Sequence, residues 1–262
     1  MARRVAIPVI STLFYILGFF ASLLKGSGRF LFKDQISFKI LVMQILFTFV
    51  EALSIGAFLA IGIGGAVIII GMPLLASFSQ EHLIYPVLIT MITRELGPLL
   101  TAFIVIARSG TAIATEIAGM VISHEIEAYI SVGVDPIEHL GVPRFLGVTI
   151  SVFLLNIYFS IFGLVFSFIV SMFFNAMPPS IYFNNLLQVL TISDILLTVV
   201  KSIAFGMIIS TVALYHGFEV ERASTEVPVA GLRAVGFAFG WCILIDILLS
   251  AIYYLMPGMN SL

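Results

Sequence analysis

The sequence predicts an all-α integral membrane protein, with about five transmembrane helices and an N-terminal helix that is interfacial or re-entrant. Two observations support this fold class. The 262-residue chain is 61% hydrophobic and only 10% charged, whereas soluble globular domains carry roughly 25% charged residues. Apolar runs of about 20 residues, the length that crosses a bilayer as a helix, recur along the chain. Alternating segments typical of transmembrane barrels do not occur in the sequence.

The first apolar run, residues 5–24, has basic residues on both flanks. Because Lys and Arg favour the cytoplasmic side of a membrane, both ends of this run are expected there, and it cannot then cross once. We interpret it as an interfacial or re-entrant helix, with a true first span as the competing interpretation. The following stretch carries Lys39, Gln44 and Glu51. Residues 1–50 are therefore expected to form an N-terminal interfacial region.

The rest of the chain, residues 52–256, is expected to form a transmembrane bundle, and the whole chain 1–262 a single membrane domain. The expected spans lie near 52–72, 83–108, 145–172, 194–216 and 233–256. Of the 12 Lys and Arg residues, none falls in a loop expected outside. Cytoplasmic loops carry an excess of Lys and Arg. This distribution predicts a cytoplasmic N-terminus and a periplasmic C-terminus.

Four ionisable residues are expected well inside the spans: Arg94, Glu95, Lys201 and Asp246. Each costs about 2.5–3.5 kcal/mol at a helix centre, and such residues normally face the bundle interior or a wet cavity. The rise per residue of a helix places them at similar depths, so Lys201 and Asp246 are expected to pair between adjacent spans. One interpretation is a polar patch that lines a substrate cavity. The other is a set of ion pairs that only hold the bundle together.

A helix break is expected beside the first two of these charges, at Gly97-Pro98. The proline ring clashes with the carbonyl four residues back, which belongs to Arg94, and proline supplies no N–H to it. The helix should therefore kink or loosen where the charges lie.

An acidic segment, residues 116–142, is expected on the cytoplasmic side as a coupling segment. Ile122, Ile126 and Ile130 recur every four residues, which predicts an amphipathic helix. A helix lying on the bilayer would favour Lys and Arg, so docking onto a soluble partner is favoured. Asp135-Pro136 is typical of a helix N-cap followed by a proline at the first position, and Pro143 is expected to end that helix. The residues assigned to coupling are Glu116, Glu125, Glu127, Asp135, Pro136 and Arg144.

The sequence lacks the residues that metal binding and nucleotide binding require. The chain has one cysteine, Cys242, and its four histidines are scattered, so no metal site is expected. There is no G-x-x-x-x-G-K-[ST] phosphate loop. Any nucleotide must therefore be bound by another chain. We expect no cofactor on this chain, no enzymatic activity of its own and no nucleic-acid partner.

Several stretches resemble the MlaE/YrbE family, the permease subunits of bacterial lipid-transporting ABC systems that work with MCE proteins. They are RELGPLLTAFIVIARSGTAIATEIAGM at 94–120, EIEAYISVGVDPIEHLGVPRF at 125–145, KSIAFG at 201–206, HGFEV at 216–220 and LIDILL at 244–249. They cover the chain in order, from the second span to the last. The R-E-L-G-P and G-V-D-P-x-x-x-L-x-x-P-R strings are the most specific of them.

The resemblance implies a homodimer of five-span subunits in the bacterial inner membrane, with an MlaE-type permease fold. It implies a cytoplasmic ABC ATPase that holds ATP and Mg²⁺ and grips residues 118–140 as a coupling helix. It also implies an MCE-domain protein on the periplasmic face, and membrane lipid as the substrate. By position, Arg94, Glu95, Lys201 and Asp246 match charged positions in the family's transmembrane core.

The sequence therefore predicts the membrane permease subunit of an ATP-driven lipid transporter, with phospholipid as the expected cargo. In this hypothesis Arg94 attracts an anionic head group and apolar side chains hold the acyl tails. One alternative is an ion-coupled secondary transporter that uses Glu95 and Asp246 as proton relays. Another is a membrane assembly subunit with no transport role, in which the buried charges are structural.

Overall fold

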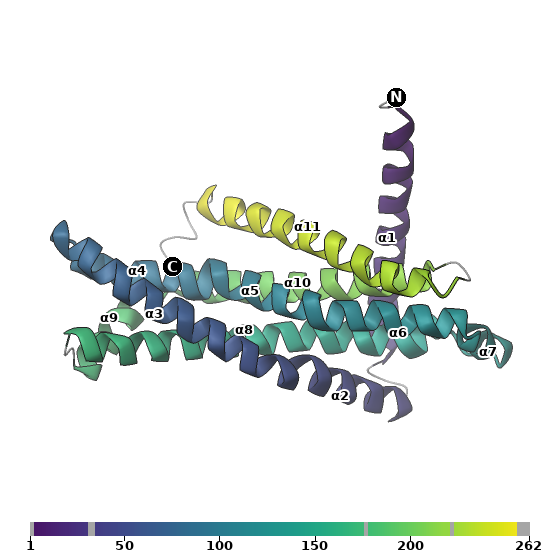
Figure 1. Cartoon of the computed structure of the whole chain (residues 1–262), viewed down its shortest axis with the longest axis horizontal. Helices are drawn as coiled ribbons and strands as arrows, with labels where there is room; N and C mark the ends of the chain where they lie inside the picture. The colour runs from purple at the N-terminus through teal and green to yellow at the C-terminus, as the bar shows by residue number, and fades with distance from the viewer. Residues whose placement is uncertain (1–2, 31–34, 176–177, 221–222, 256–262) are drawn as a thin grey trace. The chain divides into compact units, whose positions relative to one another are not determined.

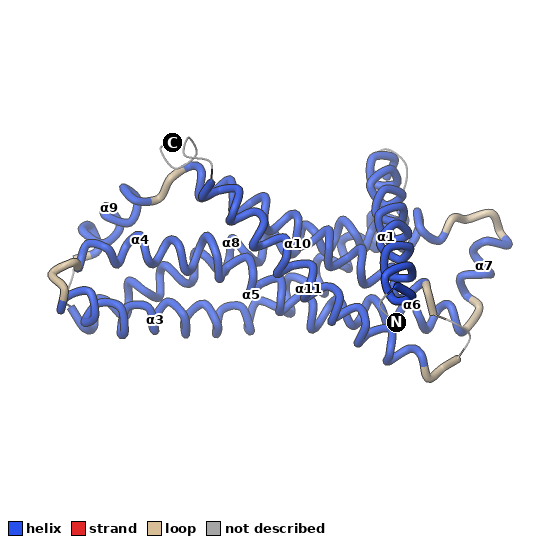
Figure 2. Tube along the Cα trace, turned by 90° about the horizontal axis from the view of Figure 1, so that it is seen from above, coloured by secondary structure: helices blue, strands red, loops and turns tan. Residues whose placement is uncertain are grey.

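The computed structural model describes residues 3–30, 35–175, 178–220 and 223–255, and within these ranges every regular element is a helix (Figures 1 and 2). Five helical stretches in the described residues are long and apolar enough to cross a membrane: Phe38–Ser77, Glu81–Ile122, Ile137–Phe173, Ile192–Phe218 and Glu226–Leu255. A shorter apolar helix, Phe14–Gly28, precedes them. The predicted all-α fold with five spans and an N-terminal apolar helix is confirmed.

The α-helices follow one another with short connections. They are α1 (Arg3–Phe30), α2 (Gln35–Phe49), α3 (Leu53–Ser77), α4 (Ile84–Leu88), α5 (Leu96–Val105), α6 (Thr111–Ile122), α7 (Glu125–Ser131), α8 (Val142–Asn175), α9 (Pro179–Val189), α10 (Ile192–Phe218) and α11 (Glu226–Leu255). Between them lie the short helical turns η1 (Val50–Ala52) and η2 (Glu81–Leu83) and the π-helical turns η3 (Ile89–Glu95), η4 (Ile106–Gly110) and η5 (Ile137–Gly141).

The helical stretches are longer than the predicted spans. The second span was expected to end near Arg108, but helix continues through η4 and α6 to Ile122, so that the stretch Glu81–Ile122 has 42 residues. At the usual helical rise this stretch is roughly 60 Å long, about twice the thickness of a hydrocarbon core. Glu116, the first residue of the predicted coupling segment, thus lies on the same helix as the span. The predicted end of the last span, Pro257-Gly258, lies outside the described residues.

The chain divides into two compact units. Unit 1 comprises Met1–Thr48, Val105–Ser151 and Gly206–Trp241, and unit 2 comprises Phe49–Ile104, Val152–Phe205 and Cys242–Leu262. Helices α8, α10 and α11 contribute residues to both units. The grouping of residues 1–262 into a single domain stays a prediction.

In unit 2, glycine allows two helices to approach closely. Gly64 on α3 lies against Gly163 on α8, where an added Cβ would be only 2.5 Å from the Gly163 carbonyl oxygen. Small residues at such contacts are typical of packed transmembrane helices. Helix α9 also packs in this unit, where Tyr182 is buried and its hydroxyl donates to the Leu164 carbonyl at 3.2 Å. The segment between the third and fourth spans, expected as a loop, therefore contains a helix, which begins at Pro179, a favoured first helical residue.

In unit 1, the N-terminal helix α1 packs against other helices. Leu23 is fully buried, and the ring of Phe19 lies edge-on to the rings of Tyr215 and Phe218, each with centroids 6.1 Å apart. A Cβ at Gly26 would lie 2.6 Å from a methyl group of Val142. The apolar face of α1 is thus covered in part by α8 and α10.

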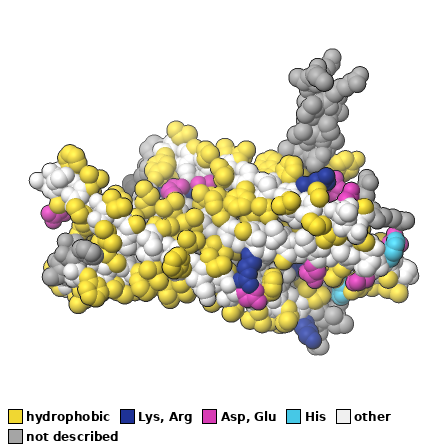
Figure 3. Space-filling model, in the orientation of Figure 1, with side chains coloured by type: hydrophobic (Ala, Val, Ile, Leu, Met, Phe, Trp, Pro, Cys, Tyr) yellow, Lys and Arg dark blue, Asp and Glu magenta, His cyan; other side chains and the backbone are white. Residues whose placement is uncertain are grey.

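The surface carries many apolar side chains. On the face shown in Figure 3, hydrophobic side chains dominate, and charged side chains lie in a few small groups. Large side chains such as Phe58, Phe173 and Leu232 are mostly exposed. Exposed apolar surface on this scale marks a protein whose surroundings are not water.

Candidate functional site

Lys201 is the centre of an ion-pair cluster in unit 2. Its side chain on α10 is fully buried, and its Nζ donates to Oε2 of Glu95 at 2.7 Å and lies 2.8 Å from Oδ1 of Asp246. Nζ also donates to Oγ of Ser250 at 2.7 Å, and Ser250 in turn bonds Glu95. The predicted pairing of Lys201 with Asp246 is therefore present, and Ser250, which the sequence did not single out, completes the cluster. A buried charge needs such partners, because transfer from water without them is costly.

Arg94 has a separate set of partners on α10 and α11. Its Nη2 lies 2.5 Å from Oδ1 of Asp194, and its Nη1 donates to the Tyr254 hydroxyl at 3.0 Å. The guanidinium also lies over the ring of Tyr253, 4.8 Å from its centroid. Only 15% of the Arg94 side chain is exposed. In this conformation a carboxylate and two aromatic rings already satisfy the charge of Arg94.

Asp194 is a site residue that the sequence analysis missed. Its side chain is 1% exposed, and Oδ2 accepts hydrogen bonds from the backbone N–H and the hydroxyl of Thr191. Its Oδ1 accepts a bond from the Tyr253 hydroxyl at 2.9 Å, in addition to the contact with Arg94. The signal was available in the sequence, since Thr191-x-x-Asp194 has the spacing of a helix capping box. The aspartate is the first residue of the span expected near 194–216, and in the structure its contacts with Thr191 cap the start of α10.

The two sets of contacts meet at the adjacent residues Arg94 and Glu95. Together they join two cations, Arg94 and Lys201, to three carboxylates, those of Glu95, Asp194 and Asp246. Any anion that binds Arg94 must therefore compete with Asp194. In a medium of low dielectric constant, such an exchange changes the energies of the ion pairs strongly. The cluster can thus respond to a charged ligand by rearranging its pairs.

The predicted helix break lies directly beside these charges. The turn before it, η3, is π-helical, and the N–H of Leu96 bonds the carbonyl of Met91, five residues back. A Cβ at Gly97 would collide with the carbonyl oxygen of Ile92, so glycine is required in this turn. Helix α5 runs through Gly97-Pro98, and the loosened turn is the π-helical η3 directly before it. Turns of this kind occur often at functional sites.

The coupling segment lies in unit 1 and is tied at its two ends. Arg144 is buried, and its Nη2 donates to Oε1 of Glu116 on α6 at 2.7 Å. Its Nη1 donates to the carbonyl of Leu140 at 3.0 Å. The predicted N-cap is also present, since Oδ1 of Asp135 accepts the N–H of Ile137 at 2.9 Å, directly after Pro136. The ion pair between Glu116 and Arg144 therefore joins the two ends of the segment, and Asp135 caps the helical turn η5.

Pro143 does not end the helix, contrary to expectation. The turn η5 continues directly into α8, which begins at Val142 and runs through the proline. A proline inside a helix removes one hydrogen bond of the helix, and here the turn directly before it is π-helical, with the N–H of Val142 bonded to the carbonyl of Ile137. The coupling segment therefore passes into the third span without an interruption.

Helix α7 carries two more acidic residues of the segment. Glu125 and Glu127 are exposed, and no residue of this helix is buried. The three isoleucines expected on one helix are divided, since Ile122 ends α6 while Ile126 and Ile130 lie on α7, and His124 between the two helices has a left-handed backbone. Ile122 and Ile126 are half-buried and Ile130 is 60% exposed. The helix thus presents both acidic and apolar side chains that further structure could cover.

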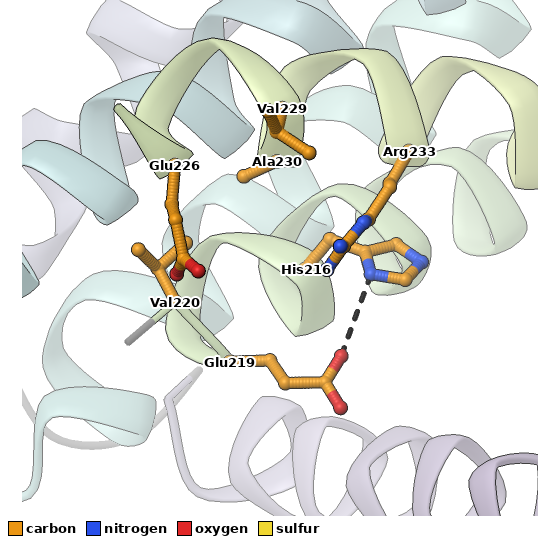
Figure 4. Close-up of a pocket in the computed structure, with 7 residues that line it drawn as sticks. All are labelled: His216, Glu219, Val220, Glu226, Val229, Ala230 and Arg233. Carbon is orange, nitrogen blue, oxygen red and sulfur yellow. Dashed lines mark ion pairs between the residues drawn. The ribbon is translucent and has the colours of Figure 1, made fainter. Parts of the chain in front are cut away.

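A small pocket lies where α10 ends and α11 begins (Figure 4). Its lining residues are His216, Glu219, Val220, Glu226, Val229, Ala230 and Arg233. Nδ1 of His216 lies 3.5 Å from Oε2 of Glu219, and the imidazole stacks on Phe237. The pocket has room for roughly one water molecule, so it does not hold a lipid head group. Among the described residues, no three His, Cys, Asp or Glu side chains are placed to bind a metal ion.

The sequence was compared with known proteins. A protein-family model described as Permease MlaE matches residues 41–252. A probable ABC transporter permease protein of Rickettsia typhi is 28% identical over 203 residues, which cover 78% of each chain. The intermembrane phospholipid transport system permease protein MlaE of Haemophilus influenzae is 27% identical over 230 residues, which cover 87% of this chain and 88% of the relative. A probable ABC transporter permease protein of Synechocystis is 26% identical over 189 residues, or 66% and 72% of the two chains.

Proposed function

Because this chain belongs to the MlaE permease family, we propose that it is the membrane-spanning subunit of an ATP-driven lipid transporter, with phospholipid as its cargo. The observation that supports this function best is the paired cluster in unit 2, where Arg94 is held by Asp194 and two tyrosines. Intramembrane charges of this kind typically mark a substrate pathway. The name of the Haemophilus influenzae relative supports phospholipid as the cargo.

The chain itself is a non-catalytic subunit, as membership of a permease family implies. We propose that ATP and Mg²⁺ are bound by a separate cytoplasmic ABC ATPase and that this chain holds no cofactor. The docking site is the coupling segment 116–142. Its exposed acidic helix α7 and the ion pair between Glu116 and Arg144 support this assignment.

The remaining assembly follows from the family resemblance and the charge distribution. Two copies of the chain form a homodimer in the bacterial inner membrane, and an MCE-domain protein binds on the periplasmic face. The five spans and the distribution of Lys and Arg support a cytoplasmic N-terminus and a periplasmic C-terminus. In this orientation α7 lies on the same side of the membrane as the ATPase.

The mechanism uses the exchangeable ion pairs. ATP binding on the partner moves α7, and the movement passes along the helical stretch Glu81–Ile122 to the break at Gly97-Pro98. A shift there changes the direction of Arg94. The guanidinium then leaves the carboxylate of Asp194 and binds the phosphate of a lipid. Its planar set of N–H donors matches an anion with several oxygen atoms. Return of Asp194 releases the lipid.

The experiment is ATP-dependent lipid transfer by the purified complex in proteoliposomes. Arg94→Ala should reduce transfer at least tenfold while the complex still assembles, and Arg94→Lys should recover only part of it, because a lysine cannot bind bidentately. Undiminished transfer by Arg94→Ala would remove this residue from the mechanism. Transport by the chain alone, driven by a proton gradient, would instead support the ion-coupled alternative that uses Glu95 and Asp246. If lipid transfer stays normal after all the charges of the cluster are removed, those charges have only a structural role.

A further inference from the structure

Pro98 removes one backbone donor from the second span. In η3 the hydrogen bonds run to the carbonyl five residues back, as between Leu96 and Met91. After the break, α5 follows the ordinary spacing of four residues. Pro98 has no N–H to give in either pattern. The missing N–H would serve the carbonyl of Arg94 at the ordinary spacing of four residues, or that of Thr93 at the spacing of five.

Two side chains of α10 donate to these same two carbonyls. Oγ1 of Thr198 donates to the carbonyl of Thr93 at 3.0 Å, and Nζ of Lys201 donates to the carbonyl of Arg94 at 3.2 Å. Thr198 and Lys201 are three residues apart, so they lie on one face of their helix. Thr198 is 7% exposed and Lys201 is fully buried. Each of the two carbonyls that an N–H at position 98 could have served thus has one buried donor from the same neighbouring helix.

The opposite side of the broken turn is packed against α8. A Cβ at Gly97 would come within 3.1 Å of Oδ1 of Asn156, a residue that is 1% exposed. The turn is therefore held between α10, which supplies hydrogen bonds, and α8, which supplies close contact. Removal of a hydrogen bond from α10 would leave a buried carbonyl unsatisfied, which costs more than the bond itself contributes.

We propose that Thr198 and Lys201 form a latch that holds the turn before Pro98 in its π-helical register, and that this register directs the Arg94 and Glu95 side chains. A π-bulge adds one residue to a turn, and each residue of a helix corresponds to a rotation of about 100°. Movement or closure of the bulge would therefore rotate these two side chains away from the residues that now pair with them. Thr198 is a positioning residue in this arrangement, because it acts only through the backbone of Thr93.

The latch gives the lipid site a means of control. While it is closed, Arg94 remains paired with Asp194. Its opening rotates Arg94 and makes the guanidinium available to an anionic head group. This last step rests on the proposed function, whereas the control of the helical register does not.

The first test measures hydrogen exchange of backbone amides in residues 89–105 of the assembled complex in nanodiscs. Thr198→Val removes the hydroxyl with little change of shape and should speed exchange in this turn about tenfold. Thr198→Ser keeps a hydroxyl and should stay close to the unaltered protein. Ser202→Ala is the matched control, because Ser202 lies one turn further along α10 and its hydroxyl donates only to carbonyls of its own helix. Equal exchange in Thr198→Val and the unaltered protein would overturn the latch.

The second test uses Pro98→Ala, which restores an N–H at the break. The restored donor can satisfy one of the two carbonyls, so Thr198→Val should change exchange less than twofold in this background. The same tenfold effect in both backgrounds would show that Thr198 does not act on the proline break, and would overturn the proposal. If Thr198→Val alone fails to assemble, recovery of assembly in the double variant supports the latch, and failure of both variants contradicts it.

Lipid transfer distinguishes the latch from the transport function. Thr198→Val should alter the rate of ATP-dependent transfer, and Thr198→Ser should restore it. If the unaltered complex transfers no lipid but Thr198→Val still speeds exchange, the proposed function fails and the latch stands. If transfer is normal in the unaltered complex and exchange does not respond to Thr198→Val, the latch fails and the function stands.

Discussion

Arg144, at the start of α8, donates to Glu116 on α6 with 2.7 Å between Nη2 and Oε1, and so closes the coupling segment into a loop. The two side chains differ in burial, since 7% of the Arg144 side chain is exposed and 49% of the Glu116 side chain. The pair therefore joins a buried anchor to a partner that water can reach.

The first prediction follows from this difference in burial. Glu116→Gln should lower the free energy of unfolding by about 1 kcal/mol or less, because water screens the exposed carboxylate. Arg144→Ala should cost about 2–3 kcal/mol, since it also leaves the carbonyl of Leu140 without this donor. Thermal unfolding of the purified complex measures both changes. Equal losses from the two variants would contradict the assignment of Arg144 as the anchor.

The second prediction concerns docking of the ATPase. The double variant Glu125→Lys and Glu127→Lys reverses two exposed charges on α7. It should weaken co-purification with the ATPase, because charges at the edge of an interface contribute to the electrostatic attraction between the partners. The measurement is the amount of ATPase retained at physiological salt. The control is Glu81→Lys, which reverses an exposed charge in the loop expected outside. Full retention by the α7 variant would mean that docking uses other residues.

The third prediction separates charge from shape in the buried cluster. Lys201→Met should destabilise the protein by about 3 kcal/mol, because it leaves the half-buried carboxylates of Glu95 and Asp246 without their cation. The triple variant that adds Glu95→Gln and Asp246→Asn should regain most of this loss, since all three charges are then gone. Thermal unfolding in detergent is the measurement. A triple variant no more stable than Lys201→Met would show that the cluster contributes packing and not charge pairing.

The fourth prediction concerns close helix packing in unit 2. Gly64→Ala should destabilise the protein by about 1–3 kcal/mol, because the new methyl group would press against the backbone of Gly163. Gly62→Ala, two residues earlier on α3, is the matched control, since an added Cβ there meets nothing within 4 Å. The control should be neutral or stabilising by about 0.5–1 kcal/mol, because alanine favours helix over glycine. The melting temperature should therefore fall for Gly64→Ala and stay the same or rise for Gly62→Ala.

The charged cluster shows which ion pairs could be predicted from the sequence and which could not. Depth along the helices placed Arg94, Lys201 and Asp246 at one level, and the pair of Lys201 with Asp246 is present. The partner of Arg94 was not found in this way. Asp194 lies at the start of α10, and whether a residue at a helix end reaches a neighbouring span depends on the rotation and tilt of both helices. These are set by packing between helices, which periodicity in one segment does not contain.

The helix boundaries differ for a related reason. The lengths of apolar runs indicated the number of spans, since a bilayer requires about 20 apolar residues for a crossing. Helix continues beyond those runs, as from Arg108 to Ile122, because backbone hydrogen bonding does not stop where hydropathy falls. Pro143 was expected to end a helix and lies inside one, because the π-helical turn η5 directly before it continues into α8.

The sequence by itself determined that the chain is an all-helical membrane protein with five spans, that four charges lie within them, and that one span is broken at Pro98. These properties are local, because composition, run length and the missing proline N–H act within a single segment. Only the tertiary structure decided that Asp194 holds Arg94, that Glu116 holds Arg144, and that Thr198 and Lys201 satisfy the broken turn. Each of those choices joins residues 28 or more positions apart, and only the packing of helices brings such residues within hydrogen-bonding distance.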